Sequence, residues 1–86
     1  MQKYLVEFVG TLFFLFTILA TGNPIAIVAA LYIAIVIGGS ISGGHFNPAV
    51  STMMTFAGKL PKKELPAYLL AQLSGGLSAW YIHSLI

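Results

Sequence analysis

The feature that most constrains this chain is the near absence of charge over most of its length. No Asp, Glu, Lys or Arg occurs between Glu7 and Lys59, and only 7% of the 86 residues are charged. An average soluble domain has about 25% charged residues, and a chain this small cannot bury so much apolar surface in a core of its own. The sequence therefore predicts an integral membrane protein.

The composition also argues against several kinds of site. The net charge is only +2 and no arginine is present, so we do not expect a partner that is a nucleic acid. The chain has no cysteine and no aspartate, so neither a metal site nor any other cofactor is predicted. No serine has a base arranged beside it and no acid–base pair is evident, so an enzyme is not expected.

Long apolar segments define the predicted topology. Residues 4–21 make a helix of about 27 Å, close to the ~30 Å hydrocarbon core of a bilayer. Residues 25–41 give a second span after a short break of turn formers, and residues 65–86 give a third. These ranges predict an all-α membrane protein with three transmembrane helices, organised as a single domain over residues 1–86.

A polar, helix-breaking stretch, SGGHFNPAV, interrupts this apolar sequence before the third span. Asn47 is a favoured N-cap, Pro48 suits the first helical position and Gly58 suits a helix end. Residues 48–58 would form a helix of about 16 Å, which is half a bilayer. Irregular backbone at membrane depth must be buried in protein or line a watery cavity. Residues 42–47 are therefore predicted to be a re-entrant loop.

The start of this half-helix has the chemistry to handle a neutral polar solute. Its unpaired N–H groups carry roughly half a positive elementary charge, which disfavours cations. As the N-cap, Asn47 can accept from the backbone N–H of Ala49 or Val50, and its NH₂ group then remains free to donate. A capped helix start with no solute is the alternative. The backbone carbonyls of the loop can accept hydrogen bonds from molecules that pass in single file. These carbonyls belong to Gly43, Gly44, His45 and Phe46.

Glu7 lies about one turn inside the first predicted helix, where an ionisable group is costly and functional by default. We expect its carboxylate to accept hydrogen bonds from the N–H groups of the loop or from His45. The alternative is an interfacial charge that reaches the membrane surface. In either case the expected role is structural support.

The third predicted helix carries features of packing and of membrane interfaces. Ala71, Gly75 and Ala79 form a stripe of small residues that suits close helix packing. Two aromatic residues toward its ends, Tyr68 and Trp80, are expected at the membrane interfaces, together with Tyr81 and His83.

Three segments together resemble the first half of an aquaporin, of the major intrinsic protein family. SGGHFNPAV resembles the family's first Asn-Pro-Ala box, and EFVGTLFFLF resembles its first helix with a buried glutamate. FAGKLPKKELPAYLLAQLSGG resembles the basic loop and third helix of bacterial water channels. The resemblance covers the whole chain. It implies that Glu7 and Gln72 support the loop and that Asn47, Pro48 and Ala49 belong to the pore.

The family resemblance also implies a complete fold of two such repeats, inverted about a two-fold axis in the membrane plane. Their half-helices meet at the midplane, and water or small neutral solutes such as glycerol pass in single file. This sequence holds one repeat. It has no arginine, Val50 follows its box, and Ile27 stands where water channels usually have a bulky aromatic residue. Ile27 and Val50 are therefore expected to line a wider, less polar constriction.

A lone repeat leaves its loop open to lipid, so a partner is expected. We expect an inverted second copy, hence an antiparallel homodimer, with four such pores in a tetramer of dimers. With the N-terminus inside, every lysine, including those of the basic loop 59–64, is cytoplasmic. The inverted copy then requires dual topology. The alternatives are a separately encoded inverted half, a fragment of a longer channel, or a non-conducting protein that interacts with full-length channels.

Overall fold

The chain folds entirely into helices, which confirms the predicted all-α class. The computed structural model describes all residues, 1–86, and contains no strand. Two of the helices, α1 and α2, are each long and apolar enough to cross a membrane. The elements are α1 (Gln2–Thr21), α2 (Pro24–Ser42), α3 (Pro48–Phe56), the 3₁₀ helix η1 (Lys62–Glu64) and α4 (Leu65–Ser84).

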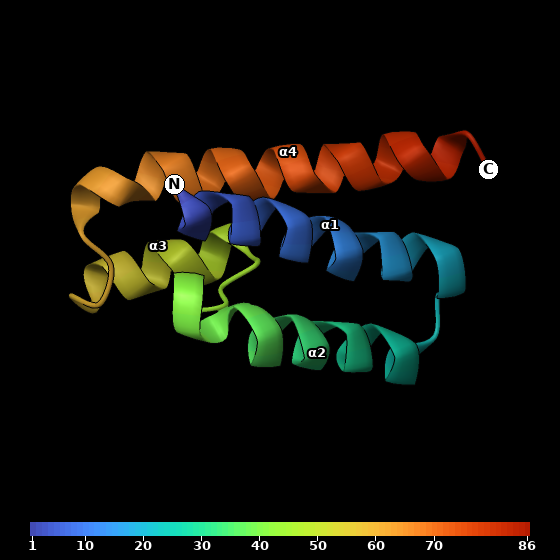
Figure 1. Cartoon of the computed structure of the whole chain (residues 1–86), viewed down its shortest axis with the longest axis horizontal. Coiled ribbons are helices and arrows are strands. Elements are labelled where there is room, and N and C mark those ends of the chain that lie inside the picture. Colours follow the sequence, from blue (N-terminus) through green and yellow to red (C-terminus); the bar gives the residue numbers. More distant parts are fainter.

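Three long helices lie side by side, with α1 between the other two (Figure 1). α2 runs antiparallel to α1, whereas α4 runs parallel to it, because the segment after α3 returns the chain to the end where α1 begins. The molecule measures 38 × 23 × 20 Å. Its long axis is comparable to the ~40–45 Å thickness of a bilayer with its headgroups.

Local sequence sets the turn between α1 and α2. Gly22 ends α1 in the left-handed conformation, with φ 56°, and its N–H donates to the carbonyl of Ile18. Asn23 then caps α2 by accepting from the N–H groups of Ile25 and Ala26. The cap satisfies two of the donors that a helix start leaves unpaired, so only two residues separate the first helix from the second.

The short helix α3 begins inside the molecule and runs outward toward the end where α1 begins (Figure 1). It packs against α4. α3 ends at Phe56, whereas the sequence pattern placed its end at Gly58. Gly58 has a φ of 77°, and the N–H of Lys59 donates to the carbonyl of Met54 at 2.8 Å. This is a Schellman ending, in which the left-handed glycine lies two residues beyond the last helical one. The long helices differ from their predicted ranges by one or two residues at most ends.

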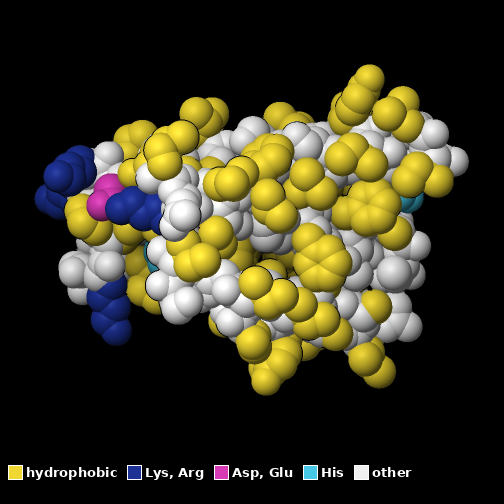
Figure 2. All heavy atoms as spheres, in the orientation of Figure 1, with side chains coloured by type: hydrophobic (Ala, Val, Ile, Leu, Met, Phe, Trp, Pro, Cys, Tyr) yellow, Lys and Arg dark blue, Asp and Glu magenta, His cyan; other side chains and the backbone are white.

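The buried interior is small and rich in polar side chains, while the outside is apolar. Only 16 of the 86 residues are buried, and they include Glu7, Thr11, Ser42, His45, Ser51, Thr55 and Gln72. Apolar side chains cover most of the visible surface, and the lysines gather at the end where α1 begins (Figure 2). A polar interior with an apolar exterior is the arrangement that a hydrocarbon surrounding favours, because polar groups must then find partners inside the protein.

Candidate functional site

The segment between α2 and α3 turns the chain back into the molecule over residues 43–47. Gly43 and Gly44 have φ angles of 93° and 66°. Glycine adopts such angles at little cost, so the glycine pair permits the reversal directly after α2. Phe46 also has a positive φ, 53°. A bulky residue holds this conformation only where its surroundings impose it.

Glu7 imposes part of that conformation. Its side chain is 0% exposed. Oε2 accepts from the hydroxyl of Ser42 at 2.8 Å and from the backbone N–H of His45 at 3.0 Å. Oε1 accepts from the backbone N–H of Phe46 at 2.8 Å and from Nε2 of Gln72 at 2.9 Å. A carboxylate that is fully buried is tolerated when its oxygens are hydrogen-bonded in this way. Glu7 therefore joins α1, the loop and α4, and it does not extend to the membrane surface.

A second set of hydrogen bonds ties α3 to the same cluster. Nε2 of Gln72 also donates to Oγ of Ser51 at 2.7 Å. Nδ1 of His45 lies 2.7 Å from the same Oγ. The His45 side chain thus pairs with α3, and only its backbone N–H reaches Glu7. Ser51, on the first turns of α3, links the half-helix to both the loop and α4.

Tyr68 supports the loop from α4, although the sequence placed it at a membrane interface. That expectation is wrong, because the side chain is 2% exposed and its hydroxyl donates to the carbonyl of Ser42 at 2.7 Å. Its ring lies 5.2 Å from the His45 ring and 5.7 Å from the Tyr4 ring. Tyr68 precedes Gln72 by four residues, so both lie on one face of α4. This spacing is the signal that could have identified Tyr68 from the sequence.

The Phe46 side chain fills a gap between α1 and α2. A methyl group added at Gly10 would overlap the Phe46 ring, and one added at Gly38 would lie 3.4 Å from its Cζ atom. The two glycines leave the space that the ring occupies, and the ring is 2% exposed. The loop is thereby fixed by packing as well as by hydrogen bonds. The sequence predicted only the backbone carbonyl of Phe46 as functional.

Asn47 caps α3 and keeps its donors free. Its Oδ1 accepts from the N–H of Ala49 at 2.7 Å, and its Nδ2 donates to no group of the chain. The side chain is exposed. No hydrogen bond within the chain ends on the carbonyls of residues 43–46. The start of α3 therefore carries free amide donors on Asn47, beside loop carbonyls that have no partner within the chain and a backbone that Glu7 holds in place.

The structure does not bring every predicted pore residue to this point. Pro48 and Val50 are half-buried on the first turn of α3, next to Asn47. Ile27 is half-buried near the start of α2, whereas the loop approaches α2 at Ile35, where Gly44 lies close. Eight residues of helix, about 12 Å, separate Ile27 from Ile35. A constriction at Ile27 would thus be separate from the Asn47 site. The chain holds no cluster of three His, Cys, Asp or Glu side chains that could bind a metal ion.

Tyr68→Phe is expected to lower the free energy of unfolding by about 1–2 kcal/mol, because the Ser42 carbonyl loses its buried donor. The ring contacts with His45 and Tyr4 remain. Thermal unfolding in detergent, followed by circular dichroism, measures the effect. Tyr81→Phe on the same helix is the matched control, since Tyr81 is exposed. Equal midpoints for the two variants would contradict the bracing role of the hydroxyl.

Comparison with known proteins places the chain in one family. Residues 1–86 match the family model described as major intrinsic protein. The glycerol uptake facilitator protein-like 6 of Lactiplantibacillus plantarum is 39% identical over 88 residues, which cover 92% of this chain and 41% of that protein. Aquaporin Z of Brucella melitensis is 39% identical over 94 residues, covering 92% and 41%. Aquaporin NIP1-1 of Arabidopsis thaliana is 39% identical over 93 residues, covering 92% and 31%.

The chain thus spans about two fifths of the length of the first two relatives. No solved structure gave a significant match. The proteins of this family named above are aquaporins and a glycerol facilitator-like protein, which agrees with the prediction that the chain is not an enzyme. A match over the full 86 residues, together with relatives at 39% identity, shows that the chain belongs to the major intrinsic protein family and is an integral membrane protein.

Proposed function

We propose that the chain forms half of a channel for water or small neutral solutes such as glycerol, in which the start of α3 lines the path. This proposal rests on one observation: polar groups that have no hydrogen-bond partner lie on a loop whose backbone is held in place by hydrogen bonds. Nδ2 of Asn47 and the carbonyls of residues 43–46 have no partner within the chain, while Glu7 fixes the loop that carries them. The names of the relatives, aquaporin and glycerol uptake facilitator, support the same function.

These groups can replace the hydrogen bonds that a hydroxyl solute makes in water. The solute donates to a loop carbonyl and accepts from the Asn47 amide, so it crosses the site without a large desolvation cost. Cations find no such compensation, because the N-terminus of α3 carries a partial positive charge. The donors around the Glu7 carboxylate, four in number, partly balance its negative charge behind the loop. The path therefore favours neutral molecules.

The free carbonyls also indicate that a partner covers the loop. Unpaired backbone groups are not tolerated against lipid, so we propose that α4 forms a third span and that the loop is re-entrant against an inverted second copy. Two copies then make a pore with two opposed half-helices, and four such pores form a tetramer of dimers. The N-terminus and the basic segment 59–64 lie on the cytoplasmic side of one copy. Its inverted partner has the opposite orientation.

Reconstitution of the purified chain alone tests this function. Proteoliposomes are exposed to an osmotic step, and their shrinkage is followed by stopped-flow light scattering. Fast shrinkage with a low activation energy is expected if one repeat assembles with an inverted copy. Shrinkage no faster than that of bare lipid, with the helical circular dichroism retained, would show that the chain alone does not conduct. The second half would then have to come from another chain.

Asn47→Asp is expected to weaken cation exclusion. The carboxylate can still accept from the Ala49 N–H, so the helix cap is kept, but the amide donors are lost and a negative charge faces the path. Cation leak from the reconstituted vesicles measures the change. Asn23→Asp is the matched control, because Asn23 is also an N-cap asparagine followed by proline. An ion leak in Asn47→Asp vesicles no larger than that in Asn23→Asp vesicles would count against the proposed path.

Glycerol is expected to permeate as well as water. The chain has no arginine to narrow a constriction. We propose that the aliphatic residues Ile27 and Val50 line the path at two separate levels. Glycerol uptake into the same proteoliposomes should exceed that of bare lipid vesicles. Uptake equal to bare lipid, beside rapid water flux, would indicate a narrower path than these residues suggest.

A further inference from the structure

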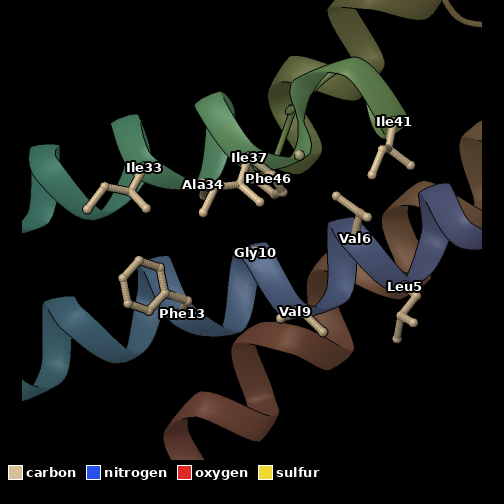
Figure 3. A pocket seen from close by; sticks show the side chains of 11 residues that line it. Leu5, Val6, Val9, Gly10, Phe13, Ile33, Ala34, Ile37, Ile41 and Phe46 are labelled. Carbon is tan, nitrogen blue, oxygen red and sulfur yellow. The ribbon is translucent and has the colours of Figure 1, made fainter.

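An open apolar groove runs along the surface between α1 and α2. Its volume is about 510 Å³, and nine of its eleven lining residues are hydrophobic, the other two being glycines. The Phe46 ring reaches it from the loop, and the side chains of α1 and α2 form its walls (Figure 3). A volume of this size falls within the range of small-molecule binding sites, ~300–1,000 Å³. No polar side chain lines it, so its ligand is apolar along the groove.

The length of the groove matches one leaflet of a membrane. It extends along α1 from Leu5 to Phe13 and along α2 from Ile41 to Ile33. Eight residues of helix measure about 12 Å, close to the ~15 Å depth of half a hydrocarbon core. This length suits a single acyl chain that enters from one side of the membrane.

Charge indicates from which side the ligand enters. The Leu5–Ile41 end of the groove lies where α1 begins and α2 ends (Figure 1). The lysines gather at this end of the molecule (Figure 2). The chain has one ion pair, between Lys3 and Glu64 at 2.8 Å. Lys59, Lys62 and Lys63 therefore have no anionic partner in the chain. These three side chains are exposed, and they complement a negatively charged headgroup at the membrane surface.

We propose that this groove binds one acyl chain of an anionic phospholipid, with Lys59, Lys62 and Lys63 attracting its phosphate. The lipid enters from the leaflet at the lysine end. The acyl chain fills the space over Phe46, between Val9 on α1 and Ile37 on α2. Bound lipid would then cover the side of the α1–α2 pair on which the Phe46 ring is packed. This binding does not depend on whether the pore conducts.

Native mass spectrometry of the purified chain tests this site. The protein is mixed with equal amounts of phosphatidylglycerol and phosphatidylcholine that carry identical acyl chains. Phosphatidylglycerol is expected to be retained roughly tenfold more than phosphatidylcholine, since lysines near the membrane surface favour anionic lipid. Lys62→Gln combined with Lys63→Gln should remove most of this preference. Equal retention of both lipids by the unmodified chain would overturn the proposal.

Two substitutions separate the groove from the rest of the apolar surface. Val9→Trp places a bulky ring in the groove at a half-exposed position, whereas Leu73→Trp adds the same ring on the outer face of α4. Val9→Trp should lose most bound phosphatidylglycerol, and Leu73→Trp should keep it. Ile37→Trp fills the groove from α2 if Val9→Trp does not fold. If a folded groove variant retains as much lipid as the unmodified chain, lipid is not the occupant of the groove. The same conclusion follows if the unmodified chain and Leu73→Trp give the mass of a dimer and the groove variants do not, because a second copy would then occupy the groove.

Discussion

Glu7→Gln is expected to lower the free energy of unfolding by about 2–4 kcal/mol. The amide has one acceptor oxygen, whereas the carboxylate accepts from four groups, the hydroxyl of Ser42, the N–H groups of His45 and Phe46, and Nε2 of Gln72. In either orientation of the amide, at least one backbone N–H of the loop faces an NH₂ group. A buried donor without an acceptor costs about 1–3 kcal/mol. Unfolding by sodium dodecyl sulfate, followed by circular dichroism, measures the change.

The same substitution at the other glutamate is its control. Glu64 pairs with Lys3 at the end of the molecule, and the Lys3 side chain is 35% exposed. Ion pairs at a protein surface contribute little to stability, so Glu64→Gln should have a small effect. Water flux should fall in Glu7→Gln vesicles and be retained in Glu64→Gln vesicles. If both variants unfold at the same detergent concentration, the loop is held chiefly by Phe46 packing and by Tyr68, and the central role of Glu7 is wrong.

Gly10→Ala is expected to destabilise the chain by about 1–3 kcal/mol, or to displace the loop, because the new methyl group enters the Phe46 ring. It would lie 2.6 Å from Cδ1 and 2.7 Å from Cζ, far inside van der Waals contact. The ring cannot move freely, because Phe46 is 2% exposed and its backbone N–H donates a hydrogen bond to Glu7. Overpacking of this kind typically costs about 1–3 kcal/mol. The unfolding midpoint and the rate of water flux report the two consequences.

Gly39→Ala is the matched control on α2. Its added methyl group would meet only Cγ2 of Ile35, at 3.8 Å, which is ordinary contact. Because alanine is the better helix former, this variant should be neutral or slightly stabilising. Phe46→Leu in the Gly10→Ala background should restore part of the lost stability, and a double-mutant cycle measures that coupling. Additive effects of the two substitutions would contradict the steric account.

The sequence was sufficient for the features that depend on neighbours in the chain. The long uncharged runs require a hydrocarbon surrounding, and Gly22 and Asn23 end one helix and cap the next through local hydrogen bonds. Asn47 caps α3 for the same reason. A carboxylate at Glu7 within an apolar helix could be expected to find donors, because an unpaired buried charge is too costly. Each of these inferences needs only the helical repeat and the chemistry of a few adjacent residues.

Tertiary structure alone decided which distant groups meet. Tyr68 has the composition of an interfacial aromatic, yet it binds the Ser42 carbonyl because α4 packs parallel to α1 and turns that face inward. Ser51 joins His45 to Gln72 only because α3 lies against α4. Phe46 occupies the space above Gly10, which lies 36 positions earlier in the chain. Such contacts depend on how helices are rotated about their axes, and an apolar sequence on all faces, as in α2, leaves that rotation unspecified until the helices pack.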